Sequence, residues 1–185
     1  FRIILKEVFP DVLASGMASI RKSYQVAVNK KVLTQTQARQ GIDRITPMTA
    51  EISMRNVDLV IEAIVEDLET KQKVLEQLEA RANKRTLFAT NTSALSISAI
   101  GNGFRHPQRL VGLHFFNPVH RMPLIEIIRG KCTSRQSVAQ AFEFANRIAK
   151  TPILVRDHPG FLVNRILIPS MIEALHLFNR GESVA

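Results

Sequence analysis

The sequence has no tryptophan, one tyrosine and one cysteine among its 185 residues. The lone Cys132 excludes an internal disulfide and a cysteine-based metal cluster, and it suits a reducing compartment. Aromatic side chains that could stack on bases are scarce, and the lysines and arginines behind the net charge of +9 form no long block. These features argue against a nucleic-acid partner. No apolar run is long enough for a membrane span, and the first residues lack a signal-peptide pattern.

The glycine-rich turn of dinucleotide-binding folds, Gly-x-Gly-x-x-Gly, is also missing. In those folds the turn precedes, by about 20 residues, an acid that ends the second strand and binds the adenine ribose. Glu7 ends an apolar run and fits that acid, which would place the turn upstream of Phe1. A solvated strand-end carboxylate is the more common interpretation of Glu7. Because the first residue is not Met, we expect the natural chain to begin upstream.

What is present is a hydrophobic content of 45%, enough for a substantial core, in which strand and helix patterns alternate. This alternation predicts an α/β domain with a doubly wound, mostly parallel sheet. Strands are predicted at residues 1–7, 57–64, 86–90, 110–115, 124–128 and 152–155, and helices at 10–31, 34–42, 67–82 and 138–149. The run at 57–64 is apolar nearly throughout, which is typical of a strand covered on both faces.

A junction is predicted at residues 157–160, where Asp-His-Pro-Gly interrupts the pattern. The following stretch, 161–178, is apolar on nearly every helical face and should therefore be buried. Pro169 would kink this helix or begin a second one. We therefore expect a domain over 1–157, and over 158–185 the start of a helical domain that further sequence or a partner covers.

The main catalytic candidate is His114, which stands in one predicted strand twelve positions before Glu126 in the next. The Asn117-Pro118 turn between the strands could bring them side by side, so that Glu126 orients the imidazole ring and stabilises its protonated form. A lone histidine would more often be a hydrogen-bonded core residue. The remaining histidines show no metal-ligand spacing, so no metal site is predicted.

Three further groups are candidates for ligand binding. Glu66 and Lys71 follow a strand end, where open α/β sheets bind ligands, although a surface ion pair is the more common outcome. Asn91-Thr92-Ser93 also follows a strand and would either bind a ligand or cap the next helix. Ser23 and Lys30 are two helical turns apart and could hold a phosphate together, although a solvated helix face explains them more simply.

These motifs resemble the NAD-binding domain of the L-3-hydroxyacyl-CoA dehydrogenases, most closely the dehydrogenase part of the bacterial multifunctional fatty-acid-oxidation α subunit. The resemblance covers nearly the whole chain and is carried by Asn91-Thr92-Ser93, by GLHFFNPVHRMPLIEIIRG at 112–130 and by PGFLVNRIL at 159–167, with support from LVIEAIVEDLETK at 59–71. It implies oxidation of L-3-hydroxyacyl-CoA to 3-ketoacyl-CoA with NAD in fatty-acid β-oxidation.

The resemblance also implies residue roles. His114 would be the general base and Glu126 its partner, and Ser93 and Asn164 would complete the active site. The residues implied to contact NAD are Glu7, Glu66, Lys71, Ser93 and Asn117; those implied to contact coenzyme A are Ser23 and Lys30. Glu7 stands where the family more often has Asp, but a glutamate also accepts ribose hydroxyl bonds, so we expect the preference for NAD to be kept.

The departure from the family pattern is the missing first strand with its glycine-rich turn. In the 3-2-1-4-5-6 strand order this strand is central, so the strands near Ile3 and Val60 would lose their shared neighbour. We therefore expect residues 1–185 alone to fold poorly and to bind NAD weakly. Alternatives are a short-chain 3-hydroxybutyryl-CoA dehydrogenase, a non-catalytic crystallin-like protein and an inactive fragment of an active parent.

For the whole protein, the resemblance implies a homodimer or a complex with a thiolase subunit through the helical domain. It implies a cytoplasmic location in a bacterium, or a mitochondrial or peroxisomal matrix location in a eukaryote.

Overall fold

The computed structural model describes residues 1–51 and 53–182, and the chain divides into two compact units, 1–53 and 54–185. Among the described residues, no helix combines the length and the hydrophobicity that crossing a membrane requires. The division differs from the one expected at residue 157, because strand pairing joins the predicted junction to the second unit. The boundary at 157 stays a prediction about the domains of the whole protein.

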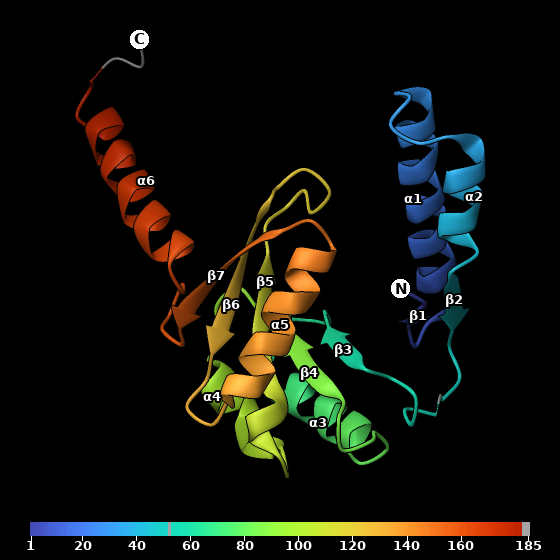
Figure 1. Ribbon diagram of the computed structural model, residues 1–185. Coiled ribbons are helices and arrows are strands. Elements are labelled where there is room, and N and C mark those ends of the chain that lie inside the picture. The colour runs from blue at the N-terminus through green and yellow to red at the C-terminus, as the bar shows by residue number, and fades with distance from the viewer. Residues whose placement is uncertain (52, 183–185) are drawn as a thin grey trace. The chain divides into compact units, whose positions relative to one another are not determined.

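The first unit is a two-stranded parallel sheet with two helices (Figure 1). Its elements are β1 (Ile3–Lys6), α1 (Pro10–Asn29), α2 (Gln35–Ile42) and β2 (Ile45–Met48). The proline at the start of α1 and the Thr34 capping box of α2 explain why both helices begin close to the predicted residues. β2 was not predicted, because Pro47 within four residues obscures the strand pattern.

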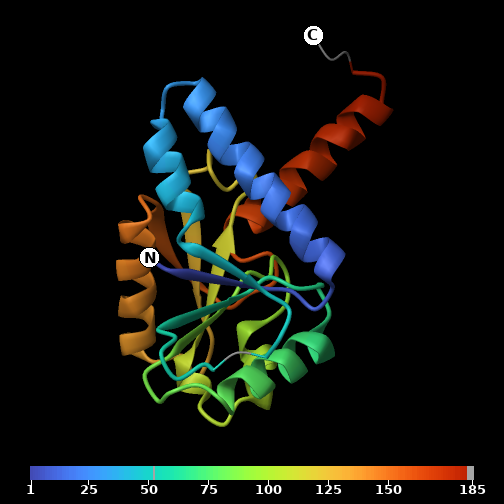
Figure 2. The same ribbon diagram turned by 90° about the vertical axis from the view of Figure 1, so that its right-hand side faces the viewer.

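The second unit contains a five-stranded sheet in the order β3-β4-β5-β6-β7 (Figure 2). Its strands are β3 (Leu59–Glu62), β4 (Leu87–Thr90), β5 (Leu110–Phe115), β6 (Leu124–Arg129) and β7 (Thr151–Arg156). All neighbours are parallel except β5 and β6, which form an antiparallel pair. This mostly parallel α/β sheet confirms the predicted fold class. β1 and β3 lie in separate sheets, as expected for strands that lack their shared neighbour.

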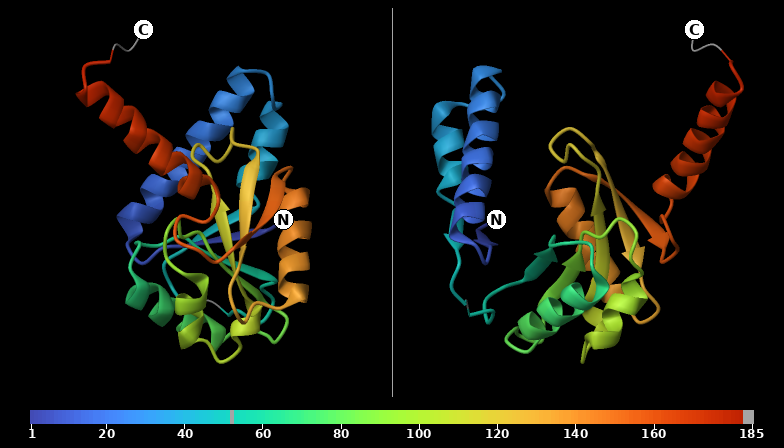
Figure 3. Two further views of the ribbon diagram at one scale, coloured as in Figure 1. Left: turned by 90° about the vertical axis from the view of Figure 1, so that its left-hand side faces the viewer. Right: turned by 180° about the vertical axis from the view of Figure 1, so that it is seen from behind.

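Helices cover the two faces of this sheet (Figure 3). α5 (Arg135–Arg147) packs through Ala141 and Ala145 against side chains of β4, β5 and β6. The opposite face receives α4 (Ile97–Ile100), whose Ile97 approaches Gly112 so closely that a Cβ there would lie 2.8 Å from the isoleucine. α3 (Leu68–Glu79) packs beside α4. The face of the sheet beneath α5 is therefore an apolar core, and the opposite face holds His114 and Glu126.

One packing prediction for this unit is wrong. β3 is covered mainly on one face: Val60 and Glu62 are buried, while Ile61 is 40% exposed. α6 (Val163–Asn179) is one helix that includes Pro169, and it has no buried residue. Within the described part of the chain nothing covers its apolar side chains, and the expectation that further sequence or a partner covers them stays a prediction. α5 also begins three residues before its predicted start, because Ser134 provides the N-cap.

Candidate active site

The antiparallel pairing of β5 and β6 brings His114 directly opposite Glu126. The imidazole Nδ1 lies 2.7 Å from the Glu126 Oε2, and both side chains are almost completely buried. Because a carboxylate only accepts hydrogen bonds, this contact places a proton on Nδ1 and leaves Nε2 free to accept one. The sequence-based expectation that the two side chains meet is fulfilled in the geometry.

Glu126 also holds the start of α6. Its second oxygen, Oε1, accepts the backbone amides of Leu162 and Val163 at 3.0 and 2.9 Å. Phe161 and Phe116 flank the imidazole with ring centroids 5.7 and 4.7 Å away. We call His114, Glu126 and the two amides the histidine cluster. Through it, one buried carboxylate fixes both the ring and the helix that carries Asn164.

A second group of charges lies at the carboxyl end of β3. Lys71 in α3 is fully buried, with its Nζ 2.7 Å from Glu62 and 3.3 Å from Glu66. We call Glu62, Glu66 and Lys71 the lysine cluster. The interpretation of Lys71 and Glu66 as a surface ion pair is therefore wrong for the lysine, whose main partner is an acid that sequence analysis did not single out.

Glu66 fastens the segment after β4. Its Oε1 accepts the Thr92 hydroxyl, the Ser93 amide at 3.0 Å and the Ala94 amide at 3.3 Å. Burial acts to raise the pKa of Glu66, but the hydrogen bonds from Thr92 and Ser93 and the charge of Lys71 outweigh it and leave the pKa lowered. The alternative that residues 91–93 cap the next helix is wrong, because Ser96 caps α4.

Three candidate side chains remain available to a ligand. The Ser93 hydroxyl and the Asn117 amide are exposed, and the Asn164 amide in the first turn of α6 is half-buried. None of the three has a side-chain partner among the described residues. β3, β4 and β5 are parallel and end at one edge of the sheet, so Glu66, Ser93 and Asn117 gather there.

The remaining candidates lie in the first unit, whose placement relative to the sheet is not determined. Glu7 follows β1 and uses one oxygen to accept the Val8 amide at 2.6 Å, which leaves its other oxygen for a ligand. Ser23 donates its hydroxyl to the Ser19 carbonyl, and Lys30 follows the last residue of α1; both are exposed.

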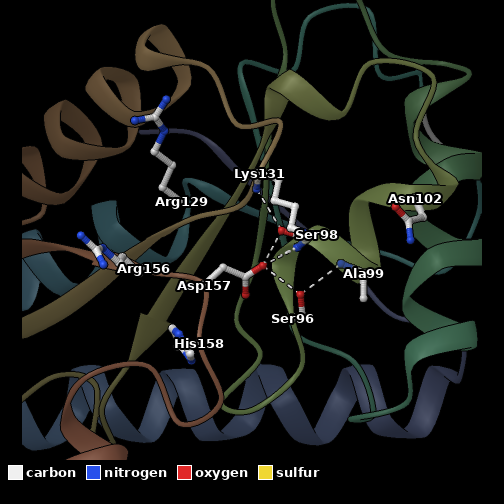
Figure 4. A pocket seen from close by; sticks show the side chains of 9 residues that line it. All are labelled: Ser96, Ser98, Ala99, Asn102, Arg129, Lys131, Arg156, Asp157 and His158. Atoms are coloured by element: carbon white, nitrogen blue, oxygen red, sulfur yellow. Dashed lines mark hydrogen bonds between the residues drawn. The ribbon is translucent and has the colours of Figure 1, made fainter.

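A pocket of about 510 Å³ lies elsewhere, around Asp157 (Figure 4). Asp157 accepts hydrogen bonds from the side-chain hydroxyls of Ser96 and Ser98 and from the backbone amides of Ile97 and Ser98, at 2.6–3.0 Å. Burial acts to raise its pKa, but these bonds outweigh it and lower the pKa. Arg129 and Arg156 point away from Asp157, so the cations do not converge on one ligand position. We interpret Asp157 as an anchor for the junction before α6.

Sequence analysis missed Glu62 and Asp157. Glu62 was visible as an acid between the apolar residues Ile61 and Ala63 of a predicted strand, and a buried carboxylate requires a partner. Asp157 was noted only as part of a turn, because its partners lie about 60 positions away in the chain.

Comparison with known proteins identifies the chain. Residues 1–158 match the family described as "3-hydroxyacyl-CoA dehydrogenase, NAD binding domain". The chain belongs to this family. The α subunit of the fatty acid oxidation complex from Acinetobacter baylyi is 42% identical over 167 residues, and that from Pseudomonas syringae is 40% identical over the same length. In both cases the match covers 90% of this chain but 23% of the relative.

Solved structures of 3-hydroxybutyryl-CoA dehydrogenases are also similar. The enzyme from Ralstonia eutropha superposes with a TM-score of 0.95 at 32% identity, over 99% of this chain and 65% of its own. The enzyme from Escherichia coli gives a TM-score of 0.94 at 32% identity, over 98% of this chain and 39% of its own. The expected family and cofactor, NAD, are thereby confirmed. Since the chain spans about a quarter of the curated relatives it matches, the activity of the whole protein is a separate question.

The residues present fit NAD at the carboxyl edge of the sheet. Glu66 is 40% exposed there and keeps accepting capacity on Oε2, and the hydroxyl of Ser93 and the amide of Asn117 are unoccupied within the described part of the chain. Such groups can hydrogen-bond a ribose or a carboxamide. In the described residues, no three His, Cys, Asp or Glu side chains are grouped to hold a metal ion.

Proposed function

We propose that the full-length protein oxidises L-3-hydroxyacyl-CoA to 3-ketoacyl-CoA in fatty-acid β-oxidation. The observation that carries this proposal is the buried 2.7 Å contact between His114 and Glu126. NAD, when bound, supplies the hydride acceptor. His114 Nε2 takes the proton from the 3-hydroxyl, and Glu126 stabilises the imidazolium that forms.

The other residues position the reactants. The free hydroxyl of Ser93 and the amide of Asn164 would hold the substrate oxygens. Glu66, Ser93 and Asn117 would hold the cofactor at the edge of the sheet, and the buried Lys71 would act through its ion pair with Glu66. From the family resemblance, Glu7 would contact the adenine ribose, and Ser23 with Lys30 would contact coenzyme A.

The test is NADH formation by the full-length protein supplied with L-3-hydroxyacyl-CoA and NAD. Absorbance at the NADH band should rise with the L enantiomer and stay flat with the D enantiomer. No NADH with any acyl chain would contradict the proposal and favour a non-catalytic, crystallin-like role. The same assay on residues 1–185 tests the alternative of an inactive fragment, for which we predict NAD binding weaker than micromolar.

A short-chain preference is the second candidate, and the similarity to two 3-hydroxybutyryl-CoA dehydrogenases favours it. The higher identity to fatty acid oxidation α subunits favours the first proposal, with no preference for short chains. Comparing kcat/KM across acyl chains from four to sixteen carbons separates the two. A maximum at four carbons would support the short-chain enzyme.

We also propose that a helical domain begins at residue 158 and that α6 is its first helix. Through this domain the protein would form a homodimer or a complex with a thiolase subunit. The exposed Ile166, Met171 and Phe178 on α6 support an apolar cover. The family match ending at residue 158 supports the boundary. The bacterial origin of the matched α subunits supports a cytoplasmic location over a mitochondrial or peroxisomal one. Mass measurement of the full-length protein in solution, with and without thiolase, tests the assembly.

A further inference from the structure

Glu62 is a buried carboxylate to which the proposed function gives no role. It is the last residue of β3, and its side chain is 1% exposed. Its Oε1 accepts the Ile64 amide at 2.6 Å, and its Oε2 accepts the Thr90 hydroxyl at 2.6 Å. A carboxylate this deep in the protein is costly unless each oxygen is hydrogen-bonded, and both are.

Glu62 determines where the ammonium of Lys71 lies. The Lys71 ammonium donates hydrogen bonds to Glu62 and to the Ile64 carbonyl at 3.3 Å, and it forms an ion pair with Glu66. The contact with Glu62 is shorter than that with Glu66, at 2.7 against 3.3 Å. The ammonium is therefore held mainly by the buried Glu62 and attracts the half-exposed Glu66 through its charge.

Glu66 links the Lys71 ammonium to the segment that carries Ser93. Its Oε2 faces Lys71, while its Oε1 accepts the Thr92 hydroxyl and the amides of Ser93 and Ala94. A path of hydrogen bonds and one ion pair therefore runs from Thr90, through Glu62, Lys71 and Glu66, to Ser93, with the ion pair joining Lys71 to Glu66. The path begins in the core and ends at an exposed hydroxyl on the edge of the sheet.

The net charge of the lysine cluster suits the binding of a cofactor at Glu66. Two carboxylates share one ammonium, so the cluster keeps one net negative charge, and the exposure of Glu66 leaves that charge facing solvent. The hydroxyl groups of a cofactor ribose can donate hydrogen bonds to a carboxylate oxygen of Glu66. We propose that Glu62 is a positioning residue for NAD: it holds Lys71, and through Lys71 it orients Glu66 and the Ser93 segment. This inference rests on the proposed function.

A purely structural role for Glu62 makes a different prediction. If Glu62 only neutralises a buried lysine, its loss lowers the melting temperature and leaves the affinity of the folded protein for NADH unchanged. If Glu62 orients Glu66 and the Ser93 segment, its loss lowers the affinity of the folded protein for NADH. The fall should also depend on Lys71, because the path runs through that residue.

Glu62→Gln in the full-length protein tests the proposal. The amide keeps the size and can still accept from Lys71 and Ile64, but it lacks the charge. We expect the Kd for NADH, measured by the fluorescence of the bound nucleotide, to rise about tenfold, which corresponds to about 1.4 kcal/mol. The KM for NAD should rise in parallel, while kcat changes by less than about threefold. Glu69→Gln is the control, because Glu69 is an exposed acid on α3, the helix that carries Lys71, and lies 3.8 Å from the exposed Lys73.

A double-mutant cycle supplies the decisive readout. In a Lys71→Met background, Glu62→Gln should raise the Kd for NADH by less than about twofold more, because the path is already broken. Thr90→Val removes one hydrogen bond to Glu62 and keeps every charge. It should raise the Kd about threefold, and it decides the matter if Glu62→Gln does not fold.

An unchanged Kd in folded Glu62→Gln, or in Thr90→Val when the first variant does not fold, overturns the inference. So does a full tenfold effect of Glu62→Gln in the Lys71→Met background. These failures differ from failure of the proposed function, in which the unmodified protein itself would form no NADH from any 3-hydroxyacyl-CoA.

Discussion

The histidine cluster and the lysine cluster each centre on carboxylates that accept several hydrogen bonds, but they differ in contact with water and in how their charge changes. Glu126 has no exposed side-chain surface, whereas 40% of the Glu66 side chain is exposed. In our proposal the histidine cluster changes charge when His114 takes a proton, and the lysine cluster keeps its charge throughout. A buried carboxylate acts strongly on a charge that develops beside it, because water does not screen the two. On this proposal the buried histidine cluster serves the reaction, and the lysine cluster serves cofactor binding through the half-exposed Glu66.

The largest expected effect is on the histidine cluster. His114→Gln removes the base, so kcat should fall by about 10²–10⁴-fold while the affinity for NADH stays within about twofold. Steady-state turnover and NADH fluorescence titration measure the two quantities on the same full-length sample. His120→Gln, at an exposed histidine in the loop after β5, is the control and should keep full turnover. An unchanged kcat in His114→Gln would remove His114 from the mechanism.

Glu126→Gln should follow closely, because it changes the tautomer of His114. An amide in place of Oε2 donates to Nδ1, and the ring proton then moves to Nε2, where it blocks proton acceptance. We expect kcat to fall by about 10²-fold or more. The other oxygen can still accept the Leu162 and Val163 amides, so α6 should keep its place.

The exposed Glu143→Gln on α5 is the matched control for Glu126→Gln. Nitrogen-15 spectra of the imidazole would show the change of tautomer directly. A variant that keeps its kcat, or keeps the Nδ1–H tautomer, would show that Glu126 does not set the ring.

How much of these two clusters the sequence could predict differs for a physical reason. His114 and Glu126 stand in adjacent strands joined by a short turn, so local pairing is enough to bring them together. Glu62, Lys71 and Thr90 meet because a helix and a neighbouring strand pack on β3, a contact that no local pattern encodes. Helix starts at Pro10 and Thr34 followed from capping chemistry. The apolar pattern of α6 predicted that further sequence or a partner covers it, but what covers it does not follow, because that depends on the surface that lies against the helix.

The lysine cluster should give a smaller effect, and one of a different kind. Glu66→Gln weakens the hold on the Ser93 and Ala94 amides and removes the exposed negative charge, so the Kd for NADH should rise about tenfold, or about 1.4 kcal/mol. kcat at saturating NAD should change by less than about fivefold, unlike in the histidine variants. Glu69→Gln again controls for loss of one acidic charge on this side of the sheet. A fall in kcat as large as that of Glu126→Gln, with unchanged affinity, would erase the contrast between the clusters.

The smallest expected effect concerns Asp157, whose hydrogen bonds hold the junction beside the histidine cluster. Its pKa is lowered in the folded protein from an ordinary value of 3.8, so the folded state binds fewer protons than the unfolded state. The stability that the carboxylate contributes is therefore fully present above that value and is lost as the pH falls through the lowered pKa. Asp157→Asn should reduce the free energy of unfolding by about 1 kcal/mol at neutral pH.

That difference between Asp157→Asn and the unmodified protein should shrink as the pH falls below 3.8. Urea unfolding at a series of pH values measures it, with Asp58→Asn, which removes an exposed acid, as the control. Glu66 has a lowered pKa too and contributes a trend of the same sign, so the experiment compares variants and not the total acid sensitivity. A difference that stays constant down to the acid limit would mean that Asp157 acts by shape alone, and the charge on its carboxylate would then have no part in holding the junction to α4.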